Sequence, residues 1–142
     1  MTKQDVKIER VFDAPIQKVW EALTNNEQMK QWYFKLPEFK AEKGFEFRFY
    51  GGRKDGIQYL HVCQITEVIK EKKLAYTWRY DGYSGDTLVT FELFEEGNKT
   101  KLVLTHEGLE TFDLSNKDFA SSNFAEGWTS IVNVALKKYL EQ

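Results

Sequence analysis

Hydrophobic and polar residues alternate along several short stretches of the chain, and such a period of two predicts half-buried strands. The first stretch runs from Val6 to Phe12, and its hydrophobic face also carries Arg10. Further alternating stretches cover residues 45–50, 57–68, 74–80, 89–93 and 100–106, and a weaker one covers residues 39–43. The stretch from 57 to 68 is longer than an average strand, so we expect it to bend or bulge. Turn residues at 51–56 and 81–86 separate neighbours, and this spacing predicts an antiparallel meander of six or seven strands.

Helical spacing replaces the alternation directly after the first strand. Pro15 suits a first helical turn, and hydrophobic residues recur at three- and four-residue spacing from Ile16 to Leu23. Residues 25–26 are both asparagine, which can end this helix and cap a second short one. The pattern therefore predicts two short helices between the first strand and the meander.

A long amphipathic helix is predicted at the end of the chain. Asn123 and Glu126 have the spacing of a capping box, and hydrophobic residues then recur at helical spacing from Trp128 to Tyr139. The helix would span about 17 residues, or roughly 25 Å, which is enough to cross a sheet. Residues 108–122 have no regular period but carry hydrophobic side chains, so we expect them to cover part of the molecule as a lid would.

This order of elements predicts an α+β fold. A strongly curved antiparallel sheet of about seven strands would hold the long C-terminal helix across its concave face, with the two short helices supporting one end. We expect residues 1–142 to form a single domain, because one hydrophobic core suffices at this length. A curved sheet closed by one helix tends to enclose a cavity, although a solid interior filled by aromatic side chains is the alternative.

Composition narrows the class of partner. Hydrophobic residues make up 42% of the chain and aromatic residues 15%, while the formal net charge is -2. The cationic excess typical of nucleic-acid binding is missing, so we expect no nucleic-acid partner. The sequence shows neither a membrane-spanning hydrophobic stretch nor a signal peptide, and Cys63 is the only cysteine. These features predict a soluble cytoplasmic protein with no intramolecular disulfide.

Several of these pieces together resemble the START-like superfamily, also called birch-pollen-allergen-like or SRPBCC. The resemblance covers nearly the whole chain and rests on residues 10–24, 31–32, 74–78, 100–106 and 127–128. Within the superfamily, the chain is most similar to the branch related to the C-terminal domain of the activator of the ninety-kilodalton heat-shock chaperone ATPase. The ordered set of motifs identifies architecture better than activity.

The resemblance implies a helix-grip fold and two kinds of function. Members of the superfamily bind lipids, sterols, polyketides or plant hormones in the cavity, and some are cyclases or dehydratases. In the chaperone activator, the related domain contacts a protein partner instead. The eukaryotic activator also has a separate N-terminal domain, for which a chain of 142 residues has no room.

Fourteen residues are predicted to line the cavity, because their alternation or helical spacing points them toward its centre. They are Arg10, Trp32, Phe47, Phe49, Tyr59, His61, Cys63, Tyr76, Trp78, Phe91, His106, Trp128, Val132 and Leu136. The polar members of this set would orient a ligand within an apolar space.

The spacing does not predict a catalytic or metal site. His61 and Cys63 share one strand face, but two ligands are too few for a closed zinc site. A cysteine within a strand is usually a small buried hydrophobic residue rather than a nucleophile. We therefore assign no catalytic residue, no metal and no cofactor.

The leading hypothesis is non-catalytic binding of a small hydrophobic molecule, such as a lipid, sterol, polyketide or flavonoid-like compound carrying an acidic or carbonyl group. The first alternative is a protein-interaction module that acts on a chaperone in the stress response. The second is a cyclase- or dehydratase-type enzyme, for which His61, His106 and Glu67 are the available acid or base groups.

Overall fold

The computed structural model describes residues 5–33, 36–52, 56–113 and 115–141. The predicted turn at 51–56 therefore falls partly outside the described residues, as does Leu114 of the predicted lid.

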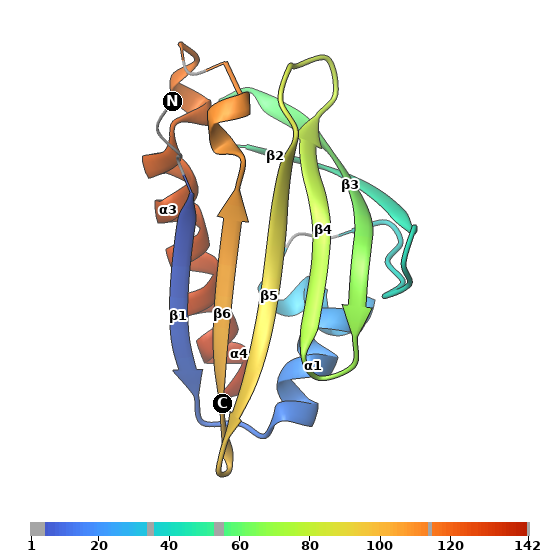
Figure 1. The fold of residues 1–142 in the computed structure, drawn as a ribbon, viewed down its shortest axis with the longest axis vertical. Helices are drawn as coiled ribbons and strands as arrows, with labels where there is room; N and C mark the ends of the chain where they lie inside the picture. The colour runs from blue at the N-terminus through green and yellow to red at the C-terminus, as the bar shows by residue number, and fades with distance from the viewer. Residues whose placement is uncertain (1–4, 34–35, 53–55, 114, 142) are drawn as a thin grey trace.

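Within these residues, six strands form one antiparallel sheet in the order β1-β6-β5-β4-β3-β2 (Figure 1). The strands are β1 (Val6–Phe12), β2 (Glu46–Gly52), β3 (Gln58–Ile69), β4 (Lys73–Tyr80), β5 (Thr87–Glu96) and β6 (Lys99–Glu107). The helical elements are α1 (Ile16–Thr24), α2 (Asn26–Trp32), η1 (Leu109–Thr111), η2 (Lys117–Phe119), α3 (Ser121–Ser130), η3 (Ile131–Leu136) and α4 (Lys137–Leu140). The predicted α+β architecture of a curved sheet, two short helices and a long C-terminal helix is confirmed.

The weak strand expected at residues 39–43 is wrong. Phe39 is buried and its ring packs edge-on against Phe47, with centroids 5.2 Å apart. The backbone beside it forms local turns instead of a ladder, because the amide of Glu42 donates to the carbonyl of Lys40 at 2.9 Å. The amide of Phe45 then donates to the carbonyl of Glu42 at 3.0 Å. Among the described strands, β2 is therefore at the edge of the sheet and pairs with β3 alone.

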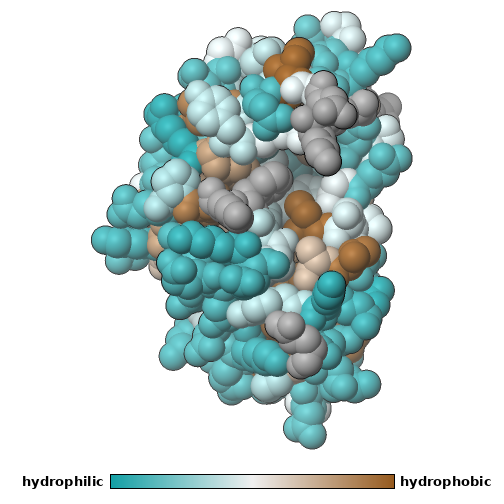
Figure 2. Space-filling view, turned by 180° about the vertical axis from the view of Figure 1, so that it is seen from behind, coloured by the Kyte–Doolittle hydropathy of each residue, from teal (hydrophilic) through white to brown (hydrophobic). Residues whose placement is uncertain are grey.

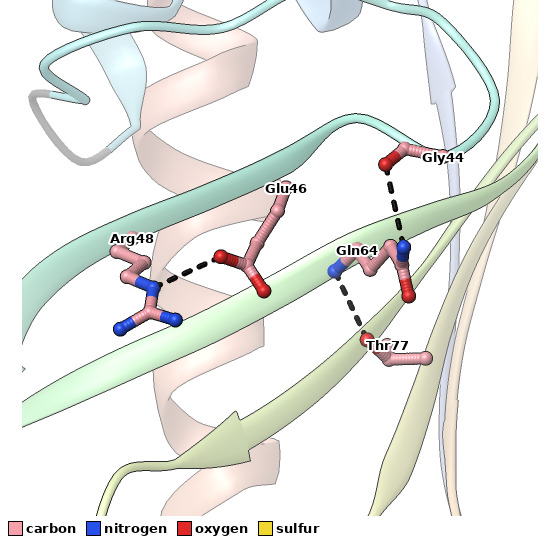
Figure 3. Close-up of polar contacts among 5 residues, drawn as sticks. All are labelled: Gly44, Glu46, Arg48, Gln64 and Thr77. Carbon is pink, nitrogen blue, oxygen red and sulfur yellow. Dashed lines mark hydrogen bonds and ion pairs between the residues drawn. The ribbon is translucent and has the colours of Figure 1, made fainter.

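The bend predicted in the long central strand is confirmed as a bulge in β3, where the register with β4 shifts between Ile65 and Glu67. Near this point, the amide of Gln64 donates to Thr77 Oγ1 of β4 at 3.0 Å, and its side chain donates to the carbonyl of Gly44 at 3.3 Å (Figure 3). These polar contacts join the segment before β2 to β3 and β4. The bulge bends β3, and the sheet curves around its aromatic inner face.

The end of the chain is one continuous helical run from α3 through η3 to α4. Its buried side chains recur at every fourth position, namely Phe124, Trp128, Val132, Leu136 and Leu140. In a regular α-helix with 3.6 residues per turn, such positions would drift around the axis by about 40° at each step. The central part, η3, is a π-helix, whose wider turn holds more residues and compensates for this drift.

The capping box predicted at Asn123 and Glu126 is wrong. The helix begins two residues earlier, at Ser121, and Asn123 lies inside its first turn. The side chain of Asn123 donates to the carbonyl of Lys117 at 2.6 Å, so it ties the helix to η2 rather than capping it. By contrast, Asn25 caps α2 as predicted, because its side chain accepts from the amide of Gln28.

The predicted lid is a packed segment that closes one end of the sheet, and we call its described residues, 108–113 and 115–120, the cap. Leu109, Phe112 and Phe119 of the cap are buried. Thr111 Oγ1 accepts from the amide of Asp86 at 2.9 Å, which fastens the cap to the loop between β4 and β5. The short helices α1 and α2 lie at the other end of the molecule (Figure 1).

Gly85 is required where this loop meets the cap. Its φ is +117°, and a Cβ at this position would overlap the ring of Phe112. Gly82 in the same loop has a φ of +81°, but a Cβ there would meet nothing within 4 Å.

We expect Gly85→Ala to destabilise the protein more than Gly82→Ala. Both substitutions introduce left-handed strain of about 1 kcal/mol, and only the first adds the overlap with Phe112, for which we expect a further loss of about 1–3 kcal/mol. Urea denaturation of the two variants measures the difference. Equal losses in both variants would mean that the cap does not pack against Gly85 as described.

Candidate functional site

The middle of the space between the sheet and the final helix is filled by aromatic rings. Trp78 on β4 contacts Trp128 on α3, with ring centroids 5.4 Å apart. Trp128 also packs edge-on against Phe91 at 6.0 Å, and Trp78 against Phe49 at 5.9 Å. Because these rings contact one another across the interior, the centre of the fold is a packed core.

A groove of about 1120 Å³ opens beside this core at the cap end. Its walls come from the β2–β3 region, β4, the cap and the first half of the final helix. The lining residues are Gly51, Gly52, Gly56, Ile57, Tyr59, His61, Trp78, Tyr80, Asp118, Phe119, Asn123, Phe124, Glu126, Gly127, Trp128 and Ile131.

Four of the fourteen predicted residues line this groove: Tyr59, His61, Trp78 and Trp128. Nine others are buried in the core but are not among the lining residues: Trp32, Phe47, Phe49, Cys63, Tyr76, Phe91, His106, Val132 and Leu136. Arg10 is half-buried on β1 and interacts electrostatically with Glu141, at the end of the chain. The prediction therefore identified the hydrophobic face correctly as an inner face, but most of that face belongs to the core.

The groove also contains residues that sequence reasoning missed. Tyr80 continues the alternating series of β4 beyond Trp78, so the pattern itself could have pointed to it. Phe119 was visible as a hydrophobic residue in an irregular segment. Asp118 and Glu126 gave no signal, because a carboxylate in a loop or on an exposed helix face is ordinary.

His106 anchors a chain of hydrogen bonds from the final helix into the sheet. Trp128 Nε1 donates to His106 Nδ1 at 3.0 Å, and His106 Nε2 lies 2.8 Å from Thr87 Oγ1. Thr87 Oγ1 donates to the carbonyl of Trp78 at 2.6 Å. An indole N–H can only donate, so Nδ1 accepts and the proton of the neutral imidazole is on Nε2. Each group in the chain is therefore satisfied, with the donors all pointing the same way.

His106 is uncharged within this series of hydrogen bonds and does not line the groove. The side chain is fully buried, and burial lowers its pKa from 6.5 to about 3. A second proton on Nδ1 would also point at the N–H of Trp128. His106 thus serves to hold the helix and does not face the groove as an acid or base.

His61 forms part of the groove wall within an aromatic cluster. Its Nδ1 lies 2.9 Å from the carbonyl of Tyr59, to which it donates, since a carbonyl can only accept. The imidazole stacks on Phe49 at 4.4 Å and meets Tyr80 edge-on at 4.7 Å. Burial lowers the pKa of His61 to about 4, although carbonyl groups around the ring partly oppose this shift.

A short hydrogen bond closes the groove wall between β3 and the cap. Tyr59 donates from its hydroxyl to Asp118 Oδ2 at 2.6 Å. Burial, followed by this bond to Asp118, raises the pKa of Tyr59. The phenol therefore remains protonated at neutral pH and can continue to hold the cap against the sheet.

The remaining chemical candidates have structural surroundings. Cys63 is fully buried, and burial raises the pKa of its thiol, which disfavours the nucleophilic thiolate. Glu67 forms an ion pair with Lys73 at 2.9 Å, and both side chains are partly exposed. Among the described residues, no group of three or more His, Cys, Asp or Glu side chains could hold a metal ion.

Comparison with known proteins identifies the family. The model of the family described as "Activator of Hsp90 ATPase homolog 1-like protein" matches residues 13–141. The chain belongs to this family. Both the predicted relationship and the helix-grip fold are thereby confirmed. Nothing among the curated proteins matches the chain.

Several solved structures resemble this protein over nearly its full length. The solution structure of BH1534 from Bacillus halodurans has 32% sequence identity and a TM-score of 0.76, with 99% of each chain covered. CV1439 from Chromobacterium violaceum has 21% identity and a TM-score of 0.82, with 98% of each chain covered.

DynU16, a protein in the dynemicin biosynthetic locus, has 21% identity and a TM-score of 0.80. The alignment covers 99% of the chain described here but 48% of DynU16, so this family member spans about half the length of that relative. In the described residues, no helix is sufficiently long and apolar to span a bilayer.

We expect the free energy of unfolding to decrease as the pH is lowered below 6.5. Both histidines of the chain regain an ordinary pKa near 6.5 on unfolding, whereas the folded values are about 4 for His61 and about 3 for His106. The unfolded state therefore binds more protons in this window, and each histidine removes up to about 1.4 kcal/mol per pH unit. Urea denaturation in small steps from neutral pH to about pH 5, above the main carboxylate titrations, measures this slope. A flat profile would show that the two rings do not remain neutral in the folded state.

Proposed function

We propose that this protein binds a small hydrophobic molecule in the groove beside the cap. The observation that supports this most is an open space of about 1120 Å³ walled by aromatic side chains, next to a core that is otherwise closely packed. Small-molecule sites are typically concave, mostly apolar and about 300–1,000 Å³ in volume. The groove is slightly larger than the upper end of this range.

The walls offer affinity through burial of apolar surface. Phe119 and Tyr80 stack with ring planes 7° apart, and Phe124 and Trp128 face the groove from α3. Each 100 Å² of apolar ligand surface removed from water would contribute about 2.5 kcal/mol. A ligand with a flat hydrocarbon body would suit walls to which so many aromatic rings contribute.

A small number of polar groups could orient this ligand. His61, Asp118 and Asn123 line the groove, and the first two are held by hydrogen bonds to or from Tyr59. Such groups fix direction while the rings supply most of the contact area. No reacting group needs to be invoked for this binding role.

The family name raises a second candidate, contact with a chaperone. The large exposed hydrophobic side chains among the described residues are interrupted by polar ones: Val11 of β1 and Phe94 of β5 lie on either side of Lys101 of β6, and Val134 lies on η3. On the face in Figure 2, hydrophobic residues likewise form small separate groups. A docking surface for a protein would need a continuous patch, so these observations favour the small-molecule hypothesis.

Gly127 allows a direct test of this proposal. It lines the groove from α3, and a Cβ at this position would meet nothing within 4 Å. We expect Gly127→Leu to fill part of the groove and weaken ligand binding at least about tenfold, whereas Gly127→Ala should bind normally and gain up to about 1 kcal/mol of stability from helix propensity.

The measurement is the tryptophan emission of Trp78 and Trp128 during titration with polycyclic aromatic compounds, sterols, flavonoids and fatty acids. The Ala variant controls for changes in the helix, and thermal unfolding confirms that both variants fold. The proposal fails if no class produces a saturable response, or if the Leu variant binds as tightly as the Ala variant.

A further inference from the structure

Among the described residues that line the groove, the charged groups are all acidic. Asp118 and Glu126 line it, and none of its described lining residues is a lysine or arginine. The ion pairs of the described residues involve other groups, so neither carboxylate is neutralised by a basic partner among them. His61, which also lines the groove, has no positive charge at neutral pH because burial lowers its pKa to about 4.

The two carboxylates reach the groove from different elements. Asp118 comes from η2 in the cap and is half-buried, and it is held in position by the hydroxyl of Tyr59 at 2.6 Å. Glu126 comes from α3, one residue before Gly127, and is exposed. Because Asp118 and Glu126 come from different elements, a polar ligand group at the mouth of the groove would encounter negative charge on more than one side.

The aromatic walls act in the same direction. The face of an aromatic ring carries partial negative charge and attracts cations. Tyr59, Tyr80, Phe119, Phe124 and Trp128 all contribute rings to the lining. An anionic group entering the groove would lose hydration beside two carboxylates and would find no positive partner among the described lining residues, whereas an ammonium group would gain both carboxylates.

We propose that the groove selects a planar hydrophobic molecule that carries a basic nitrogen, and discriminates against acidic ligands such as fatty acids. This inference rests on the proposed function, because it specifies the chemical class of the ligand bound in that groove. The sequence predicted a ligand with an acidic or carbonyl group and placed Arg10 in the cavity. In the structure Arg10 is near Glu141 instead, and we therefore expect a ligand of the opposite charge.

Three pyrene compounds that differ mainly in charge provide the test. They are 1-pyrenemethylamine, 1-pyrenemethanol and 1-pyrenecarboxylic acid, which at neutral pH are cationic, neutral and anionic. Binding is followed by quenching of tryptophan emission through energy transfer to the pyrene. We expect the amine to bind about tenfold more tightly than the carboxylate, with the alcohol between them, and we expect added salt to reduce this ratio.

Matched variants assign the preference to the two carboxylates. Asp118→Asn retains an oxygen that can accept from Tyr59, so it removes charge without removing the hydrogen bond. Together with Glu126→Gln, it should reduce the ratio of amine to carboxylate affinity to about one. Glu95→Gln is the control, because Glu95 is exposed on the β5–β6 hairpin, at the end of the sheet opposite the cap (Figure 1).

The outcomes separate this inference from the proposed function. Tight binding of the carboxylate would overturn the inference and leave the proposed function intact. A preference for the amine that survives in the double variant, or that is equally lost in Glu95→Gln, would also overturn it. If none of the three compounds binds to wild type, and the Gly127→Leu and Gly127→Ala variants behave alike, the proposed function fails as well.

Discussion

The position of the final helix depends on one buried hydrogen-bond chain. Trp128, His106 and Thr87 link α3 to β6 and β5, and the chain ends at the carbonyl of Trp78 on β4. Within an apolar interior, a donor or acceptor left without a partner costs about 1–3 kcal/mol, so sliding or rotating the helix would be penalised at several groups together. A neutral imidazole suits this role because it accepts at one nitrogen and donates at the other. The sheet and helix are thereby held in a single relative position.

The same constraint explains why the open space lies at one end. With Trp128 fixed against Trp78, the rings between the sheet and the helix are close enough to fill the centre. Toward the start of α3 the cap also packs against the helix, with Phe112 stacked on Phe124 at 5.7 Å, and Tyr59 joins the cap to β3. The groove remains where these three parts meet. The fold therefore has a packed core with a groove at one end, instead of a cavity along the length of the helix.

Local patterns predicted most of the fold but a smaller part of the groove. Alternation identifies the inner face of each strand, and it correctly predicted the burial of Phe47, Tyr76 and Phe91. The unusual length of the stretch at 57–68 correctly predicted the bulge in β3. Alternation does not show how far along a strand the core ends. Tyr59 and Cys63 are both buried on the inner face of β3, but of these two only Tyr59 lines the groove. Tyr59 contacts the cap through Asp118 and Phe119, whereas Cys63 lies farther along the strand, in the core.

The errors have similar physical causes. The position of the cap depends on tertiary contacts such as that between Thr111 and Asp86, which no short pattern records. The start of the final helix was predicted at Asn123 instead of Ser121. The side chain of Asn123 bonds to Lys117 in the preceding turn η2, and no sequence pattern indicates that turn. Likewise, the segment around Phe39 has strand-like residues, but its backbone amides find partners in local turns.

The π-helical segment determines how the last part of the chain is oriented. Losing one residue between Ile131 and Leu136 would allow a regular α-helix, but every side chain beyond the deletion would rotate by about 100° around the axis. Leu140 would then turn away from the core, and its carbonyl would leave Lys18 Nζ, which now donates to it at 2.9 Å. The extra residue in this wide turn therefore works as a phase adjustment, and through it the C-terminus stays fastened to α1.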